Sequence, residues 1–98
     1  MSLPSPAVQA ILTKADQFLA GLHRVEYKEN EDYIVVRSLR WHIGLAEASL
    51  DYFERHHATA KRIDPDCVGY ARQIEVGKAW LEEARHLLAA YEAAKEAA

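Results

Sequence analysis

Two long segments of this 98-residue chain carry apolar residues at alternating steps of three and four, and this periodicity constrains the fold most. Such steps follow the turn of an α-helix and gather the apolar side chains on one face. The earlier segment keeps the period from residue 31 to residue 58, which outweighs the strand propensity of Tyr33–Val36 at its start. The two stripes are Val36, Leu39, Ile43, Ala46, Leu50 and Phe53, and Cys67, Tyr70, Ile74, Gly77, Leu81, Ala84, Leu88 and Tyr91.

Residues that commonly begin helices precede each of three helical segments. Ser5 and Pro6 fit an N-cap and first helical position, because serine accepts an unpaired amide proton and proline has none to leave unpaired. Asn30 fits the cap of the second segment, and Asp64 followed by Pro65 fits the start of the third. We predict helices at about residues 6–25, 31–58 and 65–96, with Gly21 as an alternative, earlier end of the first.

Composition supports an all-α fold in one domain. Half of the residues are apolar and 28% are charged, as in globular proteins, and 98 residues are too few for two ordinary cores. Four glycines and three prolines supply too few turns for a β-sandwich. We therefore expect a single helical-bundle domain over residues 1–98.

The short link between the second and third helices predicts a hairpin of two long antiparallel helices. With the turn near residue 62, facing positions add to about 124, which places Leu50 opposite Ile74 and Ala46 opposite Gly77. The first helix is shorter and folds back as a lid, completing an antiparallel three-helix bundle. An alternative is a shorter hairpin in which residues 57–64 wrap back over the tip.

The lid is too short to cover the distal part of the hairpin, at about residues 51–73. Apolar side chains in that part would stay wet at a cost of about 1.5–3 kcal/mol each. We expect a second copy to cover them and complete the bundle as a homodimer. The predicted interface residues are Tyr52, Phe53, Tyr70, Ile74 and Trp80, with Trp41 next. We therefore expect a non-enzymatic interaction or regulatory protein. Besides the second copy, binding of a different partner protein stays an open alternative.

Charge and cysteine content exclude several other classes. Twelve Lys and Arg against fifteen Asp and Glu give a net charge of −3, whereas a nucleic-acid-binding protein usually needs a basic face. The chain has no apolar run long enough to cross a membrane, and we expect no secretory leader because its start lacks a basic segment followed by an apolar stretch. Cys67 is the only cysteine, so no internal disulfide can form, and we expect a cytoplasmic protein without a cofactor.

An enzymatic alternative comes from Arg37 and His42, which have the Arg-x4-His spacing. In this spacing the chain resembles the HEPN ribonucleases, which are small helical bundles that dimerise. The resemblance covers six residues, and it implies RNA cleavage in which the pair acts on a 2′-hydroxyl and the scissile phosphate across a dimer cleft. The other interpretation is that Arg37 lies along Trp41 as a cation–π pair one helical turn away.

A metal site is a further alternative. Glu54-x-x-His57 and Glu83-x-x-His86 have the ligand spacing of di-iron helical bundles, but they lie roughly 20 Å apart along the predicted hairpin. A site for a single metal ion would instead join His42 with Glu82 or His86 on facing turns. The competing interpretation is that these histidines lie at the flank of the helices, partly in water.

Overall fold

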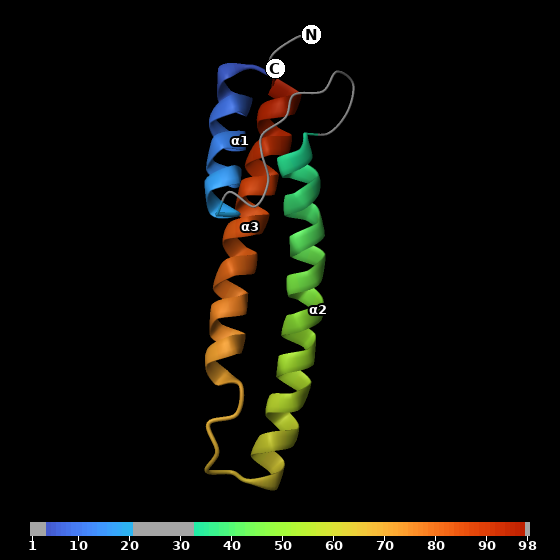
Figure 1. Cartoon of the computed structure of the whole chain (residues 1–98), viewed down its shortest axis with the longest axis vertical. Helices are drawn as coiled ribbons and strands as arrows, with labels where there is room; N and C mark the ends of the chain where they lie inside the picture. Colours follow the sequence, from blue (N-terminus) through green and yellow to red (C-terminus); the bar gives the residue numbers. More distant parts are fainter. Residues whose placement is uncertain (1–3, 21–32, 98) are drawn as a thin grey trace.

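The computed structural model describes residues 4–20 and 33–97, and the described residues form three helices and no strand. Helix α1 spans Pro6–Phe18, α2 spans Ile34–Ile63 and α3 spans Ala71–Ala97. All three pack against one another, which confirms the predicted all-helical bundle. Helices α2 and α3 form a long antiparallel hairpin, and α1 lies along the half of it that is distant from the turn (Figure 1).

Helix α1 begins as predicted and ends earlier than predicted. The Ser5 hydroxyl accepts the Val8 N–H at 3.3 Å, and Pro6 is the first helical residue. The helix ends at Phe18 instead of near residue 25, because Ala20 adopts a left-handed φ of 58° and its N–H turns back to the carbonyl of Gln17. The rest of the predicted segment, residues 21–25, lies outside the described residues.

Helix α2 begins at Ile34 with Tyr33 as its N-cap, and the predicted cap Asn30 lies outside the described residues. The helix continues to Ile63, five residues beyond the predicted end at 58. Lys61 and Arg62 lie in its last turn, where the negative end of the helix dipole favours cations. Residues 57–63 therefore extend the hairpin, and the alternative in which they fold back as a lid is wrong.

Helix α3 begins at Ala71, six residues later than predicted, because Asp64 does not cap it. Asp64 is the C-cap of α2, and its side chain accepts the Asp66 N–H at 3.1 Å in a local turn. The Cys67 N–H bonds the Asp64 carbonyl, so Cys67 lies in the loop and not on the helix. Gly69, with a φ of 61°, turns the chain towards α3.

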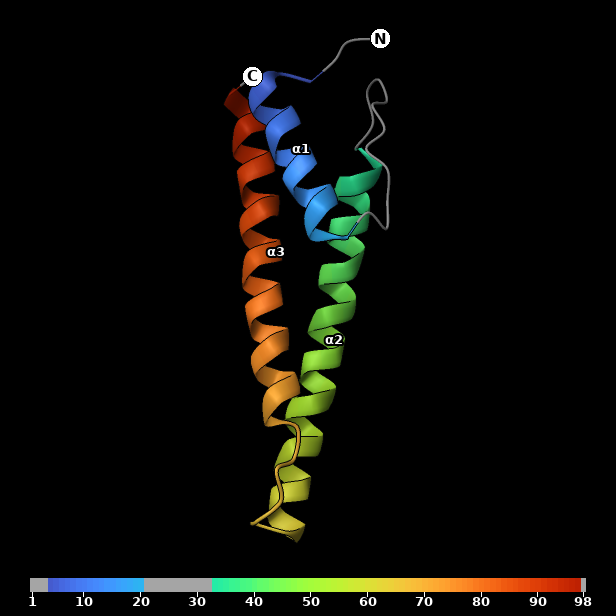
Figure 2. The ribbon, with the colours of Figure 1, turned by 60° about the vertical axis from the view of Figure 1, so that its left-hand side comes forward.

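The hydrophobic core lies where α1 rests on the hairpin. Phe18 stacks on Trp80 with ring centroids 5.0 Å apart, and Tyr33 meets the edge of Tyr91 at 6.2 Å. The molecule measures 58 × 20 × 19 Å, and only part of that length contains three helices (Figure 2). The buried apolar residues are Val8, Leu12, Ala15, Leu19, Val35, Val36, Leu39, Ile43, Leu81, Ala84 and Tyr91.

The register of the hairpin differs in part from the predicted one. Phe53 meets Tyr70 as predicted, with ring centroids 5.4 Å apart. Gly77 lies beside Leu50, one turn further along α2 than the Ala46 predicted opposite it. The difference accompanies a later turn, because α2 continues to Ile63 and the link lies at residues 64–70 instead of near residue 62.

Candidate functional site

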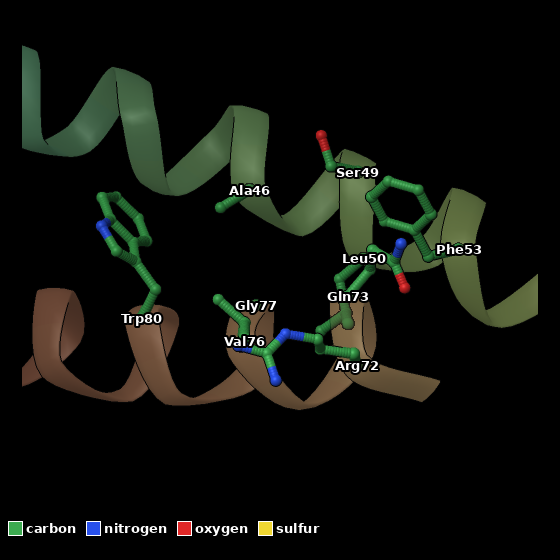
Figure 3. A pocket seen from close by; sticks show the side chains of 9 residues that line it. All are labelled: Ala46, Ser49, Leu50, Phe53, Arg72, Gln73, Val76, Gly77 and Trp80. Carbon is green, nitrogen blue, oxygen red and sulfur yellow. The ribbon is translucent and has the colours of Figure 1, made fainter. Parts of the chain in front are cut away.

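An open apolar groove runs between α2 and α3 in the part of the hairpin that α1 does not cover. Its volume is about 510 Å³. Trp80 and Phe53 stand towards its two ends, with the small residues Ala46 and Gly77 between them (Figure 3). The full lining is Ala46, Ser49, Leu50 and Phe53 from α2, and Arg72, Gln73, Val76, Gly77 and Trp80 from α3.

The groove exists because α1 is shorter than the surface of α2 and α3 on which it packs. Helix α1 has 13 residues and is about 20 Å long, whereas the 30 residues of α2 span about 45 Å. Phe18, the last residue of α1, stacks on Trp80, which itself lines the groove. The groove is therefore the continuation of the surface on which α1 packs, and no helix formed by residues 4–20 or 33–97 covers the roughly 20 Å of the hairpin beyond Phe18.

The opposite side of the hairpin is closed by three ion pairs between α2 and α3. Each pair lies seven residues from the next on both helices, which is the spacing of flanking charges in a coiled coil. Glu47 and Ser49 are two residues, or about 200°, apart around α2, so the ion pairs and the groove lie on opposite sides of the apolar seam. The pairs are Arg40–Glu92 at 3.3 Å, Glu47–Arg85 at 3.2 Å and Glu54–Lys78 at 3.8 Å.

The loop at the tip of the hairpin is attached to α2 through His57. The imidazole Nδ1 accepts the backbone N–H of Tyr70 at 2.9 Å, so this nitrogen carries no proton in the bond. Tyr70 also stacks on Phe53, and Phe53 meets the edge of Tyr52 at 5.6 Å. These contacts hold the α2 side and the α3 side of the groove together at its distal end.

Several large apolar side chains outside the groove are also exposed. Trp41, Leu45, Ala48 and Tyr52 follow one another at steps of four, three and four along the outer side of α2. At the tip, Ile63 is 80% exposed and Val68 is 78% exposed. The distal half of the molecule thus presents apolar surface in the groove, on the outer side of α2 and at the tip.

The structure brings together only some of the predicted interface residues. Phe53 and Trp80 both line the groove, Tyr70 and Ile74 are half-buried near its distal end, and Trp41 and Tyr52 lie on the outer side of α2. Sequence reasoning missed Val76, which is 57% exposed in the groove. Its position four residues before Trp80, on the same face of α3, was the signal that could have found it.

Arg37 and His42, the predicted ribonuclease pair, both lie on α2. Arg37 lines a shallow hollow with Ile34, Ser38 and Trp41, and the His42 ring stands 5.0 Å from the Trp41 ring. Five residues correspond to about 140° around a helix, so the two side chains leave α2 in different directions. Joint action on one phosphate would require residues of a second copy.

The residues of the alternative metal site are not assembled. Among residues 4–20 and 33–97, no three His, Cys, Asp or Glu side chains lie close enough together to hold a metal ion. Glu82 and His86 share a shallow hollow with Lys78 and Arg85, and His42 does not line it. Two cationic side chains at that hollow disfavour a bound cation.

No known family model, curated protein or solved structure matches this chain. In the part of the chain that the structure describes, no helix combines the length and the apolar character needed to cross a membrane.

Proposed function

We propose that this protein works by self-association, as a non-enzymatic interaction protein in which two copies join through the groove between α2 and α3. One observation supports this proposal above all: the surface on which α1 packs continues beyond the end of α1 as an open apolar groove, for roughly 20 Å. A third layer of helix covers this surface in one half of the bundle, and the distal half needs an equivalent cover.

The area of the distal half is enough for a weak interface with a second copy. A hairpin 20 Å wide with roughly 20 Å uncovered offers about 400 Å² of flat surface per copy. Two copies therefore bury about 800 Å², which is below the limit of about 1,000 Å² for a stable specific interface and in the range of weak, transient ones. We expect a dimer whose formation depends on protein concentration.

A charge placed in the groove tests the proposal. Val76 is more than half exposed, so Val76→Asp removes little core packing but would bury a carboxylate between two copies. A buried unpaired ion costs several kcal/mol, which is enough to separate the copies. The wild-type protein should approach twice the mass of one chain by light scattering, and Val76→Asp should have the mass of one chain with unchanged helix content.

Ala48→Asp is the matched control, since it adds the same charge at an exposed position on the outer side of α2, about 100° around the helix from the groove residue Ser49. The proposal expects this variant to associate like the wild type. Dissociation by Ala48→Asp but not by Val76→Asp would move the interface to the outer face that contains Trp41 and Tyr52. A wild-type protein that stays at the mass of one chain would refute self-association.

A further inference from the structure

We infer that the two copies meet groove to groove with their hairpins antiparallel, so that the middle of the dimer is a four-helix bundle and each α1 lies beyond the tip of the partner copy. This inference rests on the proposed self-association and adds the geometry of the pair.

The position of α1 excludes the parallel arrangement. Helix α1 lies in the half of the hairpin distant from the tip (Figure 2). Its last residue Phe18 stacks on Trp80, which lines the groove, so α1 is on the groove side. A helix is about 10 Å in diameter, so two parallel copies placed face to face would be held apart by their two α1 helices. When one copy is turned end for end, the uncovered halves meet each other, and neither α1 lies between them.

The tip carries the apolar residues that this arrangement needs. An overlap of roughly 20 Å brings the tip of one copy to the end of α1 in the other copy, beside Phe18 and Trp80. Ile63 and Val68, at 80% and 78% exposure, are the most exposed large apolar side chains in the described part of the chain. In the antiparallel pair they reach the apolar end of the partner's groove.

The same symmetry places one residue of α3 close to the two-fold axis. An axis through the middle of the overlap passes close to Gln73 on α3, so α3 of one copy runs antiparallel to α3 of the other. Gln73 lines the groove, and the two copies of this residue therefore come close to each other across the axis.

Cysteine cross-linking tests the arrangement directly. In a Cys67→Ser background, which removes the only native thiol, Gln73→Cys should form a disulfide-linked dimer on mild oxidation, because a disulfide requires Cα atoms within about 7 Å. Ser49→Cys is the control within the same groove, since it lies away from the axis and should not link to its own copy. Cross-linking at Ser49 but not at Gln73 would overturn the antiparallel overlap.

The mass in solution separates this inference from the proposed function. If the wild type is a dimer but Gln73→Cys does not cross-link, the antiparallel geometry is wrong while self-association stands. A wild type that has the mass of one chain overturns both.

Discussion

Replacing Gly69 by alanine should destabilise the tip of the hairpin, whereas the same replacement at Gly44 should stabilise α2. Gly69 has a φ of 61°, which costs an alanine about 1–2 kcal/mol. A β-carbon there would overlap His57 Nδ1 and stand 2.9 Å from Cε1. The imidazole must then move away from the Tyr70 N–H, and loss of that hydrogen bond costs about 1 kcal/mol more.

The expected loss at Gly69 is therefore about 2–3 kcal/mol in the free energy of unfolding. For a domain of this size, that loss lowers the melting temperature by roughly 4–8 °C per kcal/mol. Gly44 lies within α2, and a β-carbon added there would meet nothing within 4 Å. Gly44→Ala should therefore gain about 1 kcal/mol from helix propensity alone. Urea unfolding at one fixed protein concentration measures both variants.

His57→Ala separates the two parts of the Gly69 effect. Without the imidazole, Gly69→Ala should cost only the backbone term of about 1–2 kcal/mol, so the two substitutions should not be additive. The reasoning is refuted if Gly69→Ala is as stable as the wild type, or if it loses the same free energy with and without His57.

Two further outcomes follow from the structure. Leu12→Ala removes a fully buried side chain between α1 and the hairpin, and it should lower the free energy of unfolding in urea by about 2–5 kcal/mol. Val68→Ala at the exposed tip should lower it by less than about 1 kcal/mol, and equal losses for the two variants would contradict the position of the core between α1 and the hairpin. The ribonuclease hypothesis requires RNA cleavage by the wild type that His42→Ala abolishes, whereas the interaction function predicts equal RNA degradation by both proteins, or none, in a gel assay.

The helical period was sufficient to predict three helices and the hairpin. It correctly favoured a helix over the β-branched residues near Val35, because the pattern continues along α2 for many turns. The Ser5 cap was also predictable, since its signal is local. The ends of the helices were harder to predict from the sequence. Asp64 followed by Pro65 fits both a helix cap and a loop turn, and the choice between them depends on the contact between Gly69 and His57 in the folded chain.

The groove was predictable in outline but not in detail. The stripes on α2 and α3 indicated uncovered apolar surface near Phe53 and Trp80. Which side of the hairpin is open depends on the ion pairs such as Glu47–Arg85, and those depend on the register between two helices. The early end of α1 at Phe18 enlarges the open part. The helical period across residues 6–25 favoured a longer helix, and only Gly21 indicated an earlier end. These features explain why Val76 was missed.

The mass of the wild-type protein in solution tests the central claim most directly. Sedimentation equilibrium over a series of concentrations should show a rise from the 11.1 kDa of one chain towards twice that value. A mass that remains at 11.1 kDa up to the solubility limit would contradict the account, because the open groove would then have no second copy to cover it.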